Sequence, residues 1–191
     1  MKKIVLLISI VTGALMLQGC VAAFIGAGAG VAKIASDPRT TGKQVDDTSI
    51  DSKISLKLKN EEEYFKGSRI VASSYNGNVL LIGQAKSQAV INRALELAHS
   101  VDGVAKIYNQ IRVGNIVGAG TMANDAWITT HVKANLIANK ETKARDIKVI
   151  TEDGEVFLLG IVNHNEGDIA AEIASKTAKV KLVTKIFTYV D

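Results

Sequence analysis

The chain has 191 residues, and its 23 Lys and Arg residues against 19 Asp and Glu residues give a formal net charge of +4. Proteins that wrap nucleic acid carry a dense, one-sided basic stripe, so this modest charge predicts no nucleic-acid partner. The single cysteine excludes an intramolecular disulfide.

The N-terminus has the three regions of a secretory signal peptide. Lys2 and Lys3 form the charged region, residues 4–16 are almost entirely apolar, and a cleavage region ends at Cys20. The apolar stretch is shorter than the roughly 20 residues that cross a bilayer, so we predict that residues 1–19 are removed as a signal peptide. Loss of the two lysines lowers the formal net charge to +2.

The residues before Cys20 resemble the bacterial lipobox, in which a cysteine receives a diacylglycerol, the signal is cut before it, and the new amine is acylated. They are Leu17-Gln18-Gly19, with Gln18 in place of the usual small residue. Several acyl chains, at about 0.8 kcal/mol per buried CH₂, would anchor the protein permanently. Val21 stands where inner-membrane lipoproteins of enteric-type bacteria generally carry Asp. The resemblance therefore implies a lipid anchor at Cys20 and a location on the periplasmic side of the outer membrane.

Residues 20–45 have the composition of a linker. They are rich in Ala and Gly, contain the only proline, Pro38, and become polar toward their end. Such a sequence favours coil over a packed core, so we predict a lipidated flexible tether here.

The rest of the chain contains one pattern twice, and repeats of this length define structural units. The stretch from Ile70 to Gly83 matches that from Ile147 to Gly160. The repeat predicts a first domain over residues 46–114, a linker over 115–123 and a second domain over 124–191.

Each repeat predicts the same elements in the order αββαβ. Apolar residues four apart predict an opening helix, and Asp47 and Asp125 stand where helix caps would. A β-hairpin follows, because Asn76-Gly77 and Asp153-Gly154 supply two-residue turns with positive φ between alternating strands.

The second half of each repeat predicts another helix and a last strand. The helices are expected over roughly 87–100 and 166–177, and the strands over roughly 104–113 and 180–190. The predicted fold class is therefore α+β: two tandem αββαβ domains, each a three-stranded mixed sheet packed against two helices.

The turn, the strand after it and the loop before the last strand resemble the BON domain of bacterial exported proteins. The first copy reads Gly77-Asn78-Val79-Leu80-Leu81-Ile82-Gly83 and Val101-Asp102-Gly103-Val104. The second copy keeps Gly154-Glu155-Val156-Phe157-Leu158-Leu159-Gly160. It has Thr177-Ala178-Lys179-Val180 in place of the last motif, so the turn before its last strand departs from the pattern of the family.

A lipobox, a tether and two such domains together resemble the dual BON-domain outer-membrane lipoproteins of the division- and outer-membrane-stress-associated lipid-binding family. That resemblance implies phospholipid binding without enzymatic activity, a role in outer-membrane integrity, and association with the division site.

Residues for catalysis or metal binding are few. His99, His131 and His164 are far apart in the sequence, and no His/Asp/Glu spacing matches a metal site. We therefore predict no catalytic residue, no metal and no cofactor.

Trp127 is the informative residue, because its counterpart in the first copy is Ser49 and the shared core therefore does not require it. It lies about 140° around the helix from the shared apolar stripe. Its own side of the helix carries Thr130, Ala134 and Ile137.

Two interpretations of this second stripe stay open: contact with a membrane surface, or contact with the first domain. An indole suits the headgroup layer, and residues 124–145 carry a local charge of +2. We predict a surface that binds the phospholipid membrane, with anionic lipids as its expected ligands. It is formed by Trp127, Thr130, Lys133, Ala134 and Ile137. The alternative is a non-enzymatic adaptor that binds protein partners of the envelope assembly machinery.

Overall fold

The structure is a computed structural model that describes residues 40–190. The predicted signal peptide, the predicted lipid anchor at Cys20 and most of the predicted tether lie outside the described residues. None of the helices between residues 40 and 190 has the length and hydrophobicity of a membrane-spanning segment.

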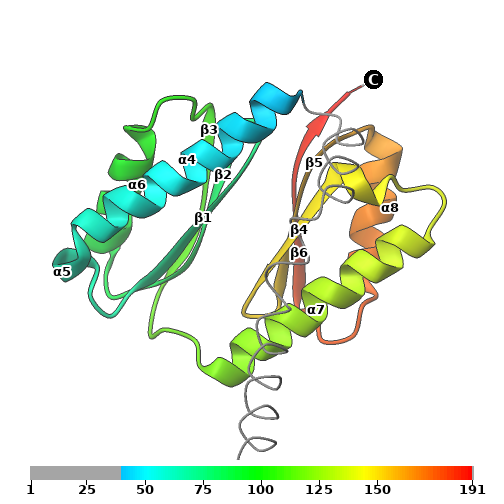
Figure 1. Cartoon of the computed structure of the whole chain (residues 1–191). Coiled ribbons are helices and arrows are strands. Elements are labelled where there is room, and N and C mark those ends of the chain that lie inside the picture. Colours follow the sequence, from blue (N-terminus) through cyan, green and yellow to red (C-terminus); the bar gives the residue numbers. More distant parts are fainter. Residues whose placement is uncertain (1–39, 191) are drawn as a thin grey trace, which may run out of the picture. The chain divides into compact units, whose positions relative to one another are not determined.

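The first domain has helices on one face of a three-stranded sheet (Figure 1). Its elements are α4 (Thr41–Asn60), α5 (Glu62–Phe65), β1 (Arg69–Tyr75), β2 (Asn78–Ala85), α6 (Gln88–His99) and β3 (Lys106–Val113).

The second domain repeats this arrangement and adds a short 3₁₀ helix. Its elements are α7 (Ala119–Ala138), η1 (Ala144–Asp146), β4 (Ile147–Glu152), β5 (Glu155–Val162), α8 (His164–Ser175) and β6 (Leu182–Tyr189). The predicted fold class, with two αββαβ units, is confirmed.

The opening helices are longer than their apolar periodicity indicates. Helix α4 begins at Thr41, inside the predicted tether, and α7 begins at Ala119, inside the predicted linker. The extra turns contain small and polar residues that contribute little to the core, so the apolar pattern gives no sign of them.

Each sheet has the second strand of the domain at its centre. Strand β2 pairs antiparallel with β1 and parallel with β3, and β5 does the same with β4 and β6. The hairpin turns have the predicted positive φ, at 53° and 79° for Asn76-Gly77 and at 48° and 76° for Asp153-Gly154.

One face of each sheet packs against the helices of its own domain. In the first domain Val79 and Leu81 of β2 contact Ile54 of α4 in one buried cluster. In the second domain the equivalent cluster joins Val156 and Leu158 of β5 to the residues of α7.

The other faces of the two sheets form a third buried cluster, which joins the domains. Its members come from both sheets and are Tyr75, Leu80, Ile82, Phe157, Leu159 and Ile186. The central strands β2 and β5 are therefore buried on both faces. Strands of this kind have nearly continuous apolar sequences instead of alternating apolar and polar residues.

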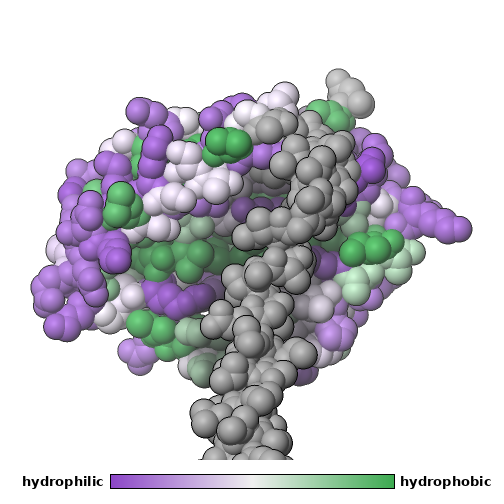
Figure 2. Space-filling view, in the orientation of Figure 1, coloured by the Kyte–Doolittle hydropathy of each residue, from purple (hydrophilic) through white to green (hydrophobic). Residues whose placement is uncertain are grey.

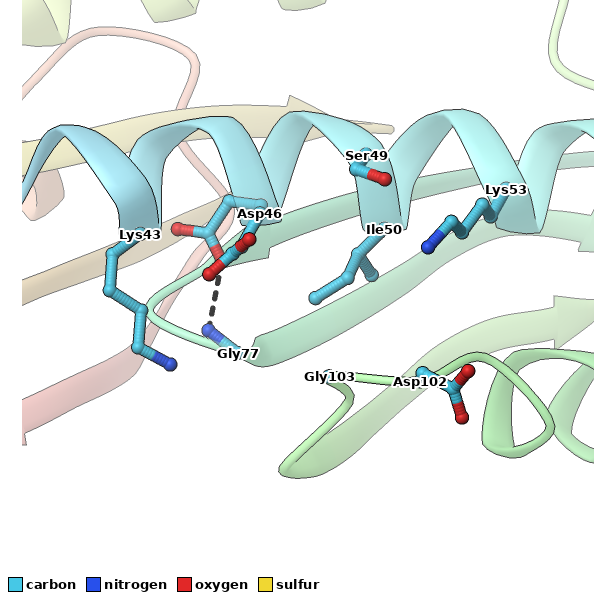
Figure 3. Close-up of a pocket in the computed structure, with 9 residues that line it drawn as sticks. Lys43, Asp46, Ser49, Ile50, Lys53, Gly77, Asp102 and Gly103 are labelled. Carbon is cyan, nitrogen blue, oxygen red and sulfur yellow. Dashed lines mark hydrogen bonds between the residues drawn. The ribbon is translucent and has the colours of Figure 1, made fainter.

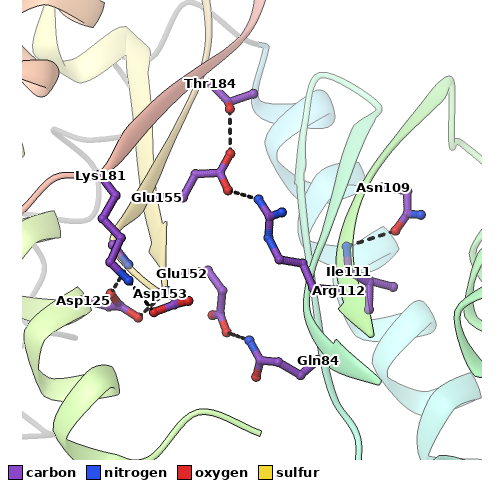
Figure 4. Close-up of polar contacts among 11 residues, drawn as sticks. Gln84, Asn109, Ile111, Arg112, Asp125, Glu152, Asp153, Glu155, Lys181 and Thr184 are labelled. Atoms are coloured by element: carbon purple, nitrogen blue, oxygen red, sulfur yellow. Dashed lines mark hydrogen bonds and ion pairs between the residues drawn. The ribbon is translucent and has the colours of Figure 1, made fainter. Parts of the chain in front are cut away.

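Polar contacts also join the two domains, among them those of Gln84 with Glu152 and of Arg112 with Glu155 (Figure 4). Arg69 donates to both carboxylate oxygens of Glu152 at 2.7 and 2.8 Å, and the Gln84 amide donates to the same carboxylate at 2.7 Å. Arg112 pairs with Glu155, which also accepts from the Thr184 hydroxyl. The two glutamates are buried, and these partners stabilise their charges.

Candidate lipid-binding surface on the second domain

Helix α7 has a buried side and an exposed side. Ile128, Val132 and Leu136 are at most 1% exposed and pack on the sheet. The predicted site residues lie on the exposed side: Trp127, Thr130, Lys133, Ala134 and Ile137.

Apolar side chains are exposed along this helix. Trp127 is 36% exposed and Ile137 is 74% exposed, which is the largest exposure among the large hydrophobic residues of the described chain. Figure 2 shows hydrophobic side chains gathered at the surface over the C-terminal part of α7. Exposed apolar side chains that gather in one patch mark surfaces that contact membranes or partners.

Trp127 contacts side chains of its own domain. The His131 imidazole stacks on the indole with 3.7 Å between ring centroids, and its Nδ1 lies 2.8 Å from the Trp127 carbonyl oxygen. The Lys179 ammonium lies over the indole, 4.7 Å from the ring centroid. The buried cluster between the domains contains neither Trp127 nor any other residue of α7.

Thr130 and Lys133, two of the other predicted site residues, differ in their contacts and in their availability to a ligand. The Thr130 hydroxyl donates to the Ala126 carbonyl at 2.9 Å. Thr130 also lines a cavity of about 420 Å³ formed by α7, β4 and Arg69 of the first domain. Lys133 is exposed and makes no ion pair within residues 40–190, so its charge is available to a ligand.

The two predicted helix caps are wrong. Asp47 and Asp125 lie inside α4 and α7, and Thr40 and Gly118 precede these helices instead. The Asp125 carboxylate accepts from the backbone N–H groups of Asp153 and Gly154 at 2.8 and 2.7 Å. Asp47 does the same for Asn76 and Gly77 at 2.7 and 2.9 Å. Figure 3 marks the bond from the Gly77 N–H with a dashed line.

These bonds fix each opening helix against its hairpin. A carboxylate that accepts two backbone N–H groups makes charge-assisted hydrogen bonds, which are stronger than neutral ones. Trp127 is two residues from Asp125, so the attachment of α7 to the turn sets the position of the indole. The repetition of Asp at this place was visible in the sequence, but the periodicity could not indicate that its partner was the turn.

Sequence reasoning did not include Lys179 in the site. The signal for it in the sequence is that Lys179 takes the place of the glycine expected before the last strand. The structure keeps the turn, with Lys179 at a φ of 70°.

Two tandem α+β domains joined through their sheets, with an exposed aromatic residue on one helix, define a small repeat protein. No group of His, Cys, Asp and Glu residues that could hold a metal ion is present in the described part of the chain.

The sequence matches the BON domain family over residues 46–115 and 124–191, so the chain belongs to the BON-domain family. Among curated proteins it is 44% identical over 191 residues to the outer membrane lipoprotein DolP of Haemophilus influenzae, covering 100% of this chain and 97% of that protein. This homology supports the predicted outer-membrane lipoprotein.

Two further relatives cover less of the chain. The 21 kDa hemolysin of Actinobacillus pleuropneumoniae is 44% identical over 155 residues, which are 81% of this chain and 80% of that protein. Osmotically-inducible protein Y of Escherichia coli K12 is 31% identical over 157 residues, which are 79% of this chain and 76% of that protein.

Proposed function

We propose that this lipoprotein binds phospholipid through α7 of the second domain, with Trp127 as the anchor, and that this binding helps to maintain the outer membrane, including at the division site. The role at the outer membrane is supported by the resemblance to the dual BON-domain lipoproteins. The choice of surface rests on one observation: Trp127 stays exposed on α7, whereas the buried apolar cluster between the domains is formed by the sheets.

The chemistry of α7 supports a membrane rather than a protein ligand. The Trp127 ring has an apolar body and a polar N–H, which suits the headgroup layer. Ile137 would lie in the apolar part of the interface, and Lys133 would meet lipid phosphates. Anionic lipids would be favoured, by about 1 kcal/mol for each well-placed cation.

The test is vesicle co-sedimentation of the chain from residue 20 onward with Cys20→Ser, which removes the acyl anchor. Trp127→Glu is expected to lower binding to vesicles that contain phosphatidylglycerol by at least about ten-fold, because a carboxylate replaces an apolar group and is repelled by the surface. Ser49→Glu, at the equivalent position of the first domain, is the matched control and should bind as the unmodified chain does.

Unchanged binding of the Trp127→Glu chain would overturn the proposal. Loss of binding in both variants would point to net charge rather than to α7. A specific protein crosslink at position 127 in cells, without vesicle binding in vitro, would favour the adaptor function instead.

A further inference from the structure

The two domains differ at the turn before the last strand. Gly103 has a φ of 93° in the first domain, and Lys179 has a φ of 70° at the equivalent position of the second. Residues with a Cβ rarely adopt this conformation, although Asn and Asp adopt it more readily. The other non-glycine residues with positive φ between residues 40 and 190 are Asn76 and Asp153. Lys179 therefore has a long cationic side chain where the backbone favours glycine.

The Lys179 side chain is directed at Trp127. Its ammonium lies 4.7 Å from the centroid of the indole, within the range of a cation–π contact. Two neighbouring lysines have carboxylate partners instead: Lys176 pairs with Glu172 at 2.5 Å, and Lys181 pairs with Asp153 at 2.9 Å. The ammonium of Lys179 makes no ion pair within the described residues.

The equivalent positions of the first domain have neither the indole nor the lysine of the turn, although Lys43 and Lys53 lie nearby. Ser49, Lys53 and Gly103 occupy the positions of Trp127, His131 and Lys179, and they line an open cavity of about 290 Å³ (Figure 3). The tryptophan and the lysine thus both appear in the second domain, where they touch, and both are absent from the first. A lysine needed only to form the turn would have no reason to accompany the tryptophan.

We propose that Lys179 is a headgroup-binding residue of the lipid surface, whose ammonium binds the phosphate of an anionic phospholipid beside the inserted indole. This inference rests on the proposed function of Trp127. When the indole enters the headgroup layer, an ammonium against its ring is carried to the level of the lipid phosphates. Its apolar stem follows the indole, and its three N–H donors reach phosphate oxygens. Lys179 thereby makes anchoring by Trp127 depend on anionic lipid.

The experiment uses the chain from residue 20 onward with Cys20→Ser, and follows the emission of Trp127, which is the only tryptophan. Vesicles are made of phosphatidylcholine alone or mixed with phosphatidylglycerol. Lys179→Gly is expected to weaken binding to the mixed vesicles about five-fold, which corresponds to about 1 kcal/mol for one cation at the surface. It should leave the weaker partition into phosphatidylcholine unchanged.

The choice of glycine keeps the result interpretable. Glycine adopts the positive φ without strain, so Lys179→Gly should be at least as stable in urea as the unmodified chain. Higher stability with weaker binding is an outcome that a purely structural role does not produce. Lys179→Arg keeps the cation and should retain the preference for phosphatidylglycerol.

Lys181→Gln is the matched control, because it removes the same charge from the same loop at a residue that already has a carboxylate partner. Equal binding of the Lys179→Gly and unmodified chains would overturn the inference, as would equal weakening by Lys181→Gln. The Trp127→Glu chain has no tryptophan, so its binding is followed by vesicle co-sedimentation. If Trp127→Glu abolishes binding while Lys179→Gly does not alter it, the proposed function stands and the role of Lys179 falls. If Trp127→Glu has no effect, the proposed function itself falls.

Discussion

Gly83 occupies a position where the backbone leaves no room for a side chain. Its φ is 121°, and a Cβ there would lie 1.9 Å from the carbonyl oxygen of Arg69 on the paired strand. We expect Gly83→Ala to lower the free energy of unfolding by about 3 kcal/mol or more, because both the conformation and the contact must change. Urea unfolding followed by circular dichroism measures this loss.

Gly120 provides the matched control for that substitution. It lies in α7, and a Cβ added there would meet nothing within 4 Å. Gly120→Ala should raise the free energy of unfolding by about 0.5–1 kcal/mol, because alanine favours the helix. Similar effects of the two substitutions would contradict the steric argument at Gly83.

Asp51 predicts a dependence of stability on pH. Its carboxylate accepts from the Ser74 N–H at 2.6 Å, yet burial raises its pKa above the ordinary value of 3.8. The folded state therefore binds the proton of the Asp51 carboxyl group more tightly than the unfolded state does. The contribution of Asp51 to the free energy of unfolding is fully present below the ordinary carboxyl pKa. It is lost as the pH rises through the raised pKa of the folded state.

Asp51→Asn removes this titration while keeping an oxygen that can accept the Ser74 hydrogen bond. We expect the variant to be more stable than the unmodified chain at neutral pH, with the difference disappearing below the ordinary carboxyl pKa. Urea midpoints at several pH values provide the measurement. A constant difference at every pH would exclude titration of Asp51 as the cause.

Strands β2 and β5 are the elements that join the domains. Leu80 and Ile82 of β2 and Phe157 and Leu159 of β5 alternate with the residues that face the helices. Because each strand is buried on both faces, we expect a core substitution in one domain to lower the stability of the other domain.

Phe157→Ala tests this coupling. Phe157 is 1% exposed, and its truncation should cost about 3–5 kcal/mol through lost burial and the cavity left behind. Amide hydrogen exchange should accelerate in β2 of the first domain as well as in β5. Val71→Ala, at a residue of β1 that is 37% exposed, is the control and should leave exchange in both strands nearly unchanged. Unaltered protection of β2 in the Phe157→Ala chain would show that the domains do not stabilise each other.

The sequence predicted the elements well where their signals are local. The Asn76-Gly77 and Asp153-Gly154 turns define both hairpins, and the stripe of Ile128, Val132 and Leu136 defines the buried side of α7. The face of β5 that carries Phe157 was not predicted, because a short apolar run does not show what covers each side. The partners of Asp47 and Asp125 were missed for a similar reason, since side-chain bonds to a distant turn have no periodicity.

At the scale of the whole molecule, the repeat identified two copies of one fold, but it could not arrange them. A repeated pattern shows which residues the two copies share. The packing of the copies depends on the sheet face through which each domain contacts the other. The candidate site, in contrast, is indicated by residues that the two copies do not share. Trp127 was found because it is not shared, and Lys179 was overlooked because its difference was attributed to the turn alone.

The sheet-to-sheet packing has a consequence for how such a chain is made. An exported polypeptide leaves the translocation channel with its N-terminal part first, so the first domain can fold before the second has emerged. Until then the side chains of Tyr75, Leu80 and Ile82 have no covering sheet, and exposed apolar surface of this kind promotes aggregation. We therefore expect this protein to be most prone to aggregation in the interval between the export of its two domains.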